Sequence, residues 1–248
     1  MTRRDWAVLV AAAICALLTT RMGVWQLDRA AQKSGVQSRI EQRTAMAPLA
    51  AHELARDAAA ADGQLHRRIT LRGRWLSRAT VYLDNRQMNG RPGFFVVTPL
   101  LLAPDDAVLV QRGWMPRDFV DRTRLQPLLD ADGELNVTGR IATPPSKLFE
   151  WQGGSAGPIR QNLDLAQFSR EIGLQLRPLS IQQLEGPELT NGLTSSRAPD
   201  GLQRQWPVPA ADVAKHHGYA FQWFALSALF VGLYAWFQII RPRRAPAQ

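Results

Sequence analysis

The sequence contains a single cysteine, Cys15, in 248 residues. One thiol cannot form a disulfide within the chain, and there is no Cys-x-x-Cys pair to exchange disulfides or to hold copper. Cys15 also lies within an apolar run, where the preceding Ala12-Ala13-Ile14 matches a lipoprotein cleavage site poorly. The cysteine content therefore excludes a disulfide-stabilised domain and a dithiol metal site.

Lysine is almost as scarce, because the only lysines are Lys33, Lys147 and Lys215. Lysine and arginine together number 30 against 21 acidic residues, which gives a net charge of +9 that arginine dominates. Nucleic-acid-binding proteins concentrate such charge in a stripe or a known motif, whereas these arginines are scattered along the chain. We therefore expect no nucleic-acid partner, and we expect contact with anionic lipid or an acidic protein surface.

Recognisable catalytic motifs are also missing. The four histidines are His52, His66, His216 and His217, and none belongs to a His-Glu-x-x-His motif or another paired ligand spacing. The sequence has no Gly-x-Ser-x-Gly motif, and no nucleophile stands beside an identifiable base. The sequence therefore favours a protein that is not an enzyme.

Two long apolar runs give the strongest positive signal. Residues 219–240 contain no Asp, Glu, Lys or Arg, and as a helix they would span roughly 33 Å, enough to cross a bilayer core. Aromatic residues at both ends of this run are typical of membrane interfaces. Residues 6–24 would span ~28 Å as a helix. A cleaved signal peptide is the alternative for this first run, but Thr20-Arg21-Met22 is a poor cleavage site, so we predict an uncleaved helix.

Basic residues beside the two runs predict their orientation. Arg3 and Arg4 precede the first run, and Arg241, Arg243 and Arg244 follow the second; such flanks stay in the cytoplasm. The short N-terminus leaves no room for a mitochondrial presequence, which favours a bacterial inner membrane. We expect a cytoplasmic tail at 1–5, a transmembrane helix at 6–25, a periplasmic α+β domain at 26–216, a second transmembrane helix at 217–240 and a cytoplasmic tail at 241–248.

The middle of the chain changes to the two-residue period of β-strands. Residues 68–75 alternate polar and apolar side chains, and further short strands with turn formers between them favour an antiparallel sheet or a small barrel. The predicted fold class is an α+β membrane protein with two transmembrane helices flanking a mainly antiparallel β domain that has a few helices. Strands are expected at 68–75, 80–83, 94–98, 108–114, 134–141 and 177–183; helices at 26–43, 49–61 and 162–172; and turns or irregular chain at 84–93, 143–158 and 185–211.

His216 and His217 are the candidate ligands because they stand immediately before the second apolar run. A neutral imidazole binds haem iron well, and at the mouth of a membrane span it would meet a hydrophobic macrocycle. On a helix His216 shares a face with Tyr219 and Trp223, at spacings of three and seven residues. His217 shares its own face with other apolar residues, so spacing alone does not exclude it. The alternative is a pair of interfacial histidines that hydrate and anchor the helix.

Arg86 and Arg91 are candidate partner-binding residues, because they flank turn formers between two apolar strands. One interpretation is an edge where either arginine meets an acidic group of a partner. The other is a hairpin with solvated charges, in which Gly90 and Gly93 allow backbone shapes closed to other residues. The residues alone leave both interpretations open.

Several short motifs, in order along the chain, carry a resemblance to a known family. Each is short, but together they are specific, and the chain resembles the surfeit locus protein 1 family of cytochrome c oxidase assembly factors. The match covers most of the chain and becomes diffuse at about residues 145–210. The motifs are Gly23-x-Trp25-Gln26-x-x-Arg29-x-x-x-Lys33, Gly73-x-Trp75, Asp84-Asn85-Arg86, Gly90-Arg91-Pro92-Gly93-Phe94, Thr98-Pro99-Leu100, Arg112-Gly113-Trp114-x-Pro116 and His216-x-x-Tyr219-Ala220-x-x-Trp223.

The resemblance implies two membrane spans around one outward-facing domain, and a role in delivering or retaining haem a. His216 holds the position of the family's histidine before the second span, so it is the expected iron ligand, while its neighbour His217 leaves the assignment ambiguous. Tyr219 and Trp223 would complete the haem-binding face. The implied partners are the catalytic subunit of cytochrome c oxidase, the haem a synthesis machinery and the lipid bilayer. The alternatives are a scaffold that holds an assembly intermediate without binding haem, and a membrane-anchored periplasmic enzyme.

Overall fold

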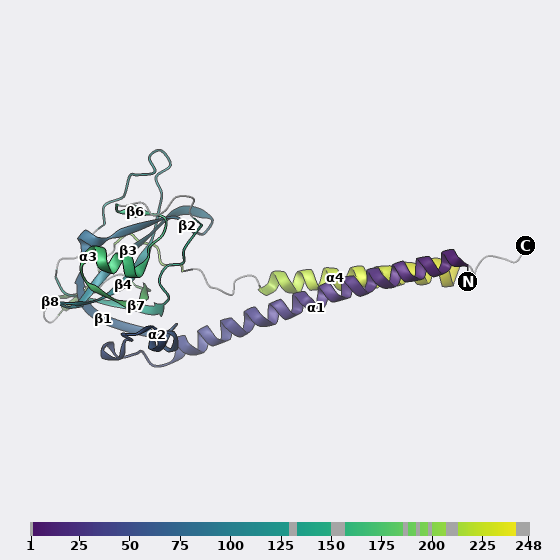
Figure 1. Ribbon diagram of the computed structural model, residues 1–248, viewed down its shortest axis with the longest axis horizontal. Helices are drawn as coiled ribbons and strands as arrows, with labels where there is room; N and C mark the ends of the chain where they lie inside the picture. The colour runs from purple at the N-terminus through teal and green to yellow at the C-terminus, as the bar shows by residue number, and fades with distance from the viewer. Residues whose placement is uncertain are drawn as a thin grey trace, which may run out of the picture. The chain divides into compact units, whose positions relative to one another are not determined.

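The computed structural model describes residues 2–128, 133–149, 157–185, 188–191, 194–197, 200–206 and 213–241. The chain divides into two compact units. One unit combines Met1–Arg39 with Val208–Gln248, and the other is Ile40–Pro207 (Figure 1). We call the first unit the helix pair and the second the barrel domain.

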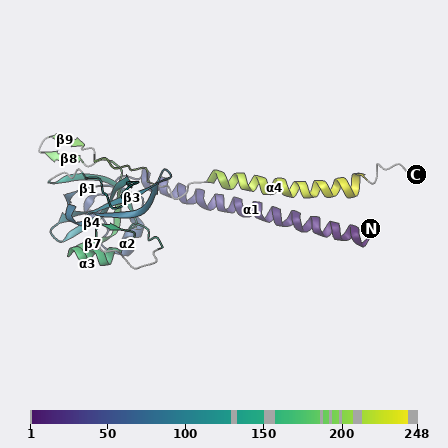
Figure 2. The ribbon, with the colours of Figure 1, turned by 90° about the horizontal axis from the view of Figure 1, so that it is seen from above.

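The helix pair consists of the two ends of the chain. Helix α1 (Arg3–Ala45) begins in this unit, and α4 (Val213–Tyr234) continues without a break into a π-helical segment, η3 (Ala235–Ile240). The two helices run side by side in opposite directions in both ribbon views (Figures 1 and 2). Among the described residues, Arg3–Ala45 and Val213–Ile240 are the two helices long and apolar enough to cross a membrane. The predicted helical continuation through 26–43 is confirmed, since α1 ends at Ala45, before Pro48.

The barrel domain is built on one sheet, which comprises nine strands within the described residues. Strand β3 pairs with β4, β4 with β7, β7 with β5, β5 with β1, and β1 again with β3, so these strands close into a ring. The pairing is mainly antiparallel, as predicted, with parallel β4–β7 and β2–β6 pairs. The strands are β1 (Arg68–Trp75), β2 (Val81–Met88), β3 (Arg91–Ala103), β4 (Asp106–Pro116), β5 (Leu135–Ala142), β6 (Ile159–Arg160), β7 (Gln175–Gln183), β8 (Glu188–Asn191) and β9 (Thr194–Arg197).

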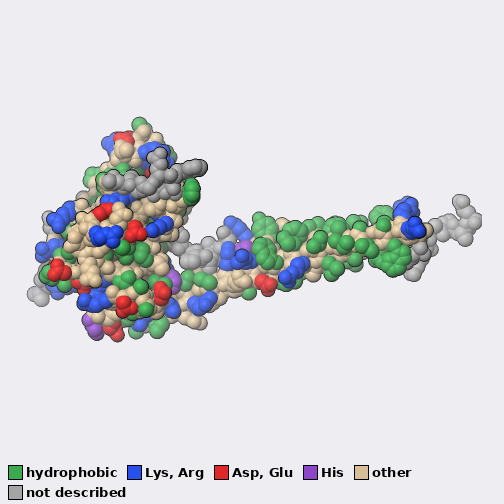
Figure 3. Space-filling view, viewed as in Figure 1, with side chains coloured by type: hydrophobic (Ala, Val, Ile, Leu, Met, Phe, Trp, Pro, Cys, Tyr) green, Lys and Arg blue, Asp and Glu red, His purple; other side chains and the backbone are tan. Residues whose placement is uncertain are grey.

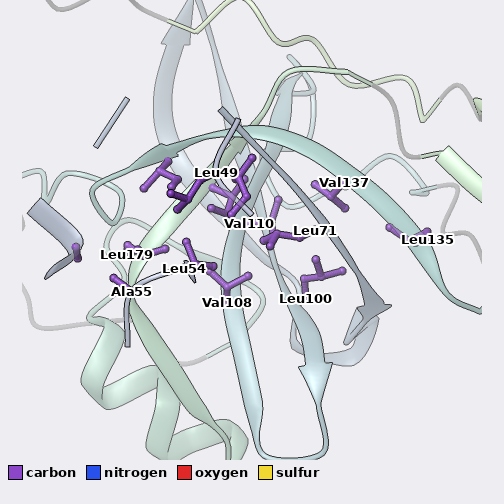
Figure 4. Packing of buried hydrophobic residues seen from close by; sticks show 14 of the residues in the cluster. Leu49, Leu54, Ala55, Leu71, Leu100, Val108, Val110, Leu135, Val137 and Leu179 are labelled. Carbon is purple, nitrogen blue, oxygen red and sulfur yellow. The ribbon is translucent and has the colours of Figure 1, made fainter. Parts of the chain in front are cut away.

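The inward faces of the ring form the main hydrophobic core (Figure 4). The predicted alternation holds in β1, where every second side chain is buried. Leu71, Val110 and Leu179 come from three different strands and meet in this core. Leu54 and Ala55, from the segment before the first strand, pack against it as well. A small barrel thus obtains one continuous apolar interior without leaving the ring open at an edge.

The stretch 84–93 differs from its prediction as a loop. Strand β2 continues to Met88 and β3 begins at Arg91, so only Asn89 and Gly90 form the turn. Both have positive φ, at 52° and 75°, which is the geometry that two-residue hairpins require. Asn85 also has positive φ, and the β2–β3 register shifts between Leu83 and Arg86. The turn formers therefore produce a tight turn and a bulge within one hairpin.

Strand β3 does not end at Pro99 as predicted, but runs on to Ala103. It pairs with β2 up to Val97 and with β1 from Leu100. Pro99 lies between these two partners, and its carbonyl accepts a hydrogen bond from the amide of Leu76 at 3.0 Å. In a strand the amide and carbonyl of one residue point to the same side. The nitrogen of Pro99 therefore faces the junction where β3 has left β2 and has not yet paired with β1, so proline removes no hydrogen bond from either ladder.

The short helices match their predictions unevenly. Helix α3 (Leu165–Ile172) begins after Asp164, whose side chain accepts from the amide of Gln167, and ends at Gly173 in the left-handed region, as expected. The predicted alanine-rich helix at 49–61 is instead a short turn, η1 (Ala51–Glu53), followed by α2 (Ala58–Gln64) capped by Asp57. A second short turn, η2 (Ser77–Ala79), precedes β2.

The stretch 185–211, predicted to be irregular, contains the antiparallel β8–β9 hairpin, which pairs with β5. Gln203 then forms a bridge with Trp114 of β4. Within 143–158 and 185–211, residues 150–156, 186–187, 192–193, 198–199 and 207–211 lie outside the described residues.

An ion pair connects Asp106, the first residue of β4, with Arg177 of β7. The guanidinium of Arg177, 6% exposed, donates to both carboxylate oxygens of Asp106 at 2.9 and 2.6 Å, and it also donates to the carbonyl of Leu54. The hydrogen bonds from Arg177 lower the pKa of Asp106 below its usual value. Because the folded-state pKa is depressed, the pair contributes stability above the unfolded-state pKa, and that stability is lost as pH falls through the folded-state value.

We predict that Asp106→Asn lowers the free energy of unfolding by about 2 kcal/mol at pH 7, because it leaves a buried guanidinium without its counter-charge. The difference from wild type should shrink in acid, below the usual pKa of an aspartate. Denaturant unfolding of the full chain in detergent, followed by tryptophan fluorescence, measures both effects. Asp105→Asn is the matched control, since Asp105 is exposed. Equal losses in the two variants, or a loss that is independent of pH, would contradict this role for the ion pair.

Candidate functional site

The close approach of α1 to α4 is set by small and polar residues. A Cβ placed on Gly23 would lie 2.7 Å from the ring of Phe224, so only glycine fits there without displacing that ring. One turn earlier, Thr20 Oγ1 lies 2.8 Å from Ser227 Oγ, and Ser227 Oγ also donates to the carbonyl of Ala16 at 3.0 Å. Small residues and hydroxyl bonds of this kind are typical of helix contacts in membranes.

The same helix contact brings His216 and Gln26 together. His216 Nδ1 lies 2.7 Å from Gln26 Oε1. An amide oxygen can only accept a hydrogen bond, so Nδ1 carries the proton in this arrangement and Nε2 of the neutral ring keeps its lone pair. Histidines that ligate metals are generally held in this way, with the other ring nitrogen donating to an oxygen. With Nδ1 as the donor, Nε2 of His216 is available to accept a hydrogen bond or to coordinate a metal.

The other predicted residues lie on the same helix, because α4 begins at Val213 and includes both histidines. His216 is half-buried and His217 is exposed. Ala220, four residues after His216, is 2% exposed, so His216 lies towards the packed side of α4. Tyr219 is 52% exposed and Trp223 is half-buried, so both retain free surface beside the packed face. Their role in binding a cofactor stays a prediction.

The helix pair combines apolar surface with positive charge. Figure 3 shows hydrophobic side chains along the helix pair, with Lys and Arg side chains at both ends. Arg29, one turn beyond Gln26, has its guanidinium carbon 5.9 Å from the centre of the Trp25 ring. Aromatic side chains can cover the face of a planar apolar ligand, and an arginine can pair with a carboxylate.

A bare metal ion fits the site less well than a metal in a macrocycle. The described residues include no group of three or more His, Cys, Asp or Glu side chains that could hold a metal ion. A porphyrin supplies its own equatorial nitrogens, so one imidazole is enough to attach its iron to the protein. The donor set around His216 is therefore compatible with haem.

The structure separates the two predicted partner-binding arginines. Arg86 is 5% exposed, and its Nη2 donates to the carbonyls of Ser146 and Gln161 at 2.9 and 3.0 Å. Arg86 is therefore not the solvated hairpin charge of the second interpretation, while its role in binding a partner stays a prediction. Arg91 is exposed beside the β2–β3 turn. A docking role for Arg91 stays a prediction.

Two further motifs of the barrel domain, those with Trp114 and Gly93, pack against each other. Trp114 is fully buried, and its Nε1 donates to the carbonyl of Arg86 at 3.0 Å. A Cβ on Gly93 would lie 2.2 Å from the carbonyl oxygen of Met115 and 2.5 Å from the Trp114 ring, so the two motifs require each other. Gly93 and Trp114 thus stabilise the hairpin against β4.

Gln26 is a residue of the candidate site that its sequence motif does not identify as a partner of His216. It stands in the motif Gly23-x-Trp25-Gln26, just after the first apolar run. The signal was available, because two antiparallel spans place the end of the first beside the start of the second. A polar residue there is then a natural partner for the histidine.

The fold and the site define a protein with two paired, candidate membrane-spanning helices joined to a small β-barrel domain. The family model for the SURF1 family matches residues 13–228. The chain belongs to this family, and the resemblance drawn from the sequence motifs is confirmed. The match includes both Gln26 and His216.

Relatives in plants, bacteria and yeast agree with this assignment. The chain is similar to "Surfeit locus protein 1" of Arabidopsis thaliana, with 29% identity over 147 residues, which covers 54% of this chain and 40% of the relative. It is 22% identical to a "SURF1-like protein" of Rickettsia prowazekii over 228 residues, 88% of this chain and 84% of the relative. It is 25% identical over 177 residues to "Cytochrome oxidase assembly protein SHY1" of Saccharomyces cerevisiae, 68% of this chain and 44% of the relative. The chain thus spans less than half the length of the plant and yeast relatives.

The contact between α1 and α4 predicts a specific crosslink. In a Cys15→Ala background, Thr20→Cys with Ser227→Cys should form a disulfide on mild oxidation, because the two side chains already touch. Leu18→Cys with Ser227→Cys is the control, since Leu18 is 62% exposed on α1. Adding Gly23→Leu should reduce the yield of the first crosslink. Gel mobility with and without reductant measures the yield, and equal crosslinking of the two pairs would refute this helix register.

Proposed function

We propose that this chain is an assembly factor for haem a-containing cytochrome c oxidase. In this role it binds haem a transiently and helps its insertion into, or retention by, the catalytic subunit. The observation that carries the proposal is the contact between Gln26 Oε1 and His216 Nδ1 within the helix pair. Membership of the SURF1 family supports it, as does the name of the yeast relative.

Each residue of the site has a defined part in this proposal. His216 ligates the iron through Nε2, and Gln26 holds the imidazole in the required tautomer and orientation. Tyr219 and Trp223 cover the apolar macrocycle, while Arg29 is placed on the adjoining turn of α1 for an acidic substituent. Haem supplies the iron and its equatorial nitrogens. One half-buried imidazole also suits transient binding, because a ligand held at one accessible point is easier to release than an enclosed one.

The location that we propose follows from charge. Both termini lie in the cytoplasm and the barrel domain in the periplasm of a bacterial inner membrane, because arginines flank the outer ends of both helices. Confinement to the same membrane raises the effective concentration of the oxidase catalytic subunit, so a weak contact is sufficient. The haem a synthesis machinery is a further partner in this proposal, which requires no catalytic residue in the chain.

A complementation experiment tests the proposal. A strain that lacks this protein should keep its haem a content but show a lower ratio of active to total oxidase catalytic subunit. Wild-type protein should restore the ratio, and His216→Ala should fail to do so, because it removes the iron ligand. Protein purified from haem a-producing cells should show haem absorbance, which His216→Ala should largely lose.

His217→Ala is the matched control, since it removes the exposed neighbouring imidazole and should retain most of the bound haem. Normal haem binding in the His216→Ala, His217→Ala double variant would place the ligand elsewhere. Restoration of the active-to-total ratio by a variant that binds no haem would favour a scaffold without cofactor. An unchanged ratio in the deletion strain, at matched growth and copper supply, would overturn the assembly role itself.

A further inference from the structure

The segment that follows β4 exposes two large apolar side chains. Phe119 is 92% exposed and Val120 is 97% exposed. The same segment buries other apolar side chains, because Leu125 and Leu128 pack against a core cluster that includes Phe94 and Met115. A nearby apolar core is therefore available, and Phe119 and Val120 project away from it into solvent.

Hydrogen bonds hold the two side chains in this projecting position. Asp118 Oδ1 accepts from the amides of Val120 and Asp121 at 2.8 and 3.1 Å. Asp121 Oδ1 in turn accepts from the amide and the hydroxyl of Thr123 at 2.8 and 2.6 Å. These bonds lower the pKa values of both aspartates, so both stay ionised at neutral pH. The two carboxylates thus bind the backbone of their own turn.

The root of the segment is fixed to the hairpin of β2 and β3. The amide of Arg117 donates to the carbonyl of Pro92 at 3.4 Å, and its guanidinium lies 3.7 Å from the Asp84 carboxylate. Pro92 adjoins the exposed Arg91, so Arg91 lies beside this root. On the other side of the apolar pair, Arg122 and Arg124 are both exposed. Phe119 and Val120 are therefore flanked by arginines.

We propose that residues 117–124, the projecting loop, insert shallowly into the surface of an anionic lipid bilayer. Phe119 and Val120 enter the boundary between headgroups and acyl chains, and Arg122 and Arg124 bind lipid phosphates. Aromatic and aliphatic side chains with nearby basic residues are the combination that such interfaces retain. The loop gives the barrel domain a membrane contact of its own.

Two observations favour lipid over a protein partner. The apolar surface is a pair of protruding side chains, whereas protein interfaces bury larger and flatter patches with a packed centre. The chain also carries two helices long and apolar enough to cross a membrane. Such anchors keep a bilayer at high effective concentration, so insertion of two side chains is enough for a stable contact even though it is weak alone.

A fluorescent probe at Val120 tests the proposal. The full chain carries Cys15→Ala and Val120→Cys, is labelled with an environment-sensitive dye, and is reconstituted in nanodiscs of phosphatidylcholine and phosphatidylglycerol. We expect blue-shifted emission, strong quenching by lipids with a nitroxide near the headgroup, and weak quenching by aqueous iodide. The same dye at Ser77→Cys, an exposed position on η2, should give red emission and strong iodide quenching.

Charge reversal tests the part played by the arginines. Arg122→Glu with Arg124→Glu should shift the Val120 probe towards aqueous emission, and nanodiscs of phosphatidylcholine alone should have a similar effect. Arg68→Glu with Arg74→Glu, exposed on β1, is the matched control and should leave the emission unchanged. A Val120 probe that stays aqueous in anionic nanodiscs would overturn the proposal. Shielding that appears only on addition of the oxidase catalytic subunit, without nitroxide quenching, would also overturn it and assign the loop to protein docking.

Discussion

The close contact between α1 and α4 is the constraint on which the candidate site depends. Gly23 has no side chain, so the ring of Phe224 can lie against the backbone of α1. The hydroxyls of Thr20 and Ser227 fix the register one turn away. With distance and register both set, Gln26 must meet His216. A bulky residue at Gly23 would separate the helices and would also break the hydrogen bond between Gln26 and His216. The orientation of the imidazole therefore depends on the packing of the two helices.

The barrel domain is stabilised by a separate set of interactions. Its ring closes because β3 exchanges β2 for β1 near Pro99, and two of its buried arginines have partners within the domain. Arg177 is neutralised by Asp106, and Arg86 is bound by carbonyls. Burying a charge is costly unless it is paired or hydrogen-bonded, which explains why an arginine-rich chain can still form a compact core. Motif residues of this domain such as Gly93 and Trp114 thus pack in its interior, whereas His216 of the helix pair belongs to the candidate site.

The sequence predicts well those features that neighbouring residues determine. It predicts poorly those that depend on contacts between residues far apart in the chain. The cap at Asp164 and the stop at Gly173 identify α3, and alternation identifies β1, because a few neighbouring residues decide each. Ring closure through β1 and β3 and the β8–β9 hairpin depend on distant pairings, so local patterns did not reveal them. The burial of Arg86 was missed because its acceptors, Ser146 and Gln161, come from distant parts of the chain. The His216–Gln26 pair, 190 residues apart, depends on the register between two helices.

In the contact with Gln26 Oε1, His216 is the tautomer with Nδ1 protonated, which leaves Nε2 free to ligate. Nitrogen NMR of isotope-labelled histidine, with the chain in lipid bilayers at neutral pH, measures this directly, and His216→Gln assigns the signal. The account predicts a protonated Nδ1 and an unprotonated Nε2 on His216, with the preference lost in Gln26→Leu. An Nε2-protonated ring, or a signal unaffected by Gln26→Leu, would contradict it.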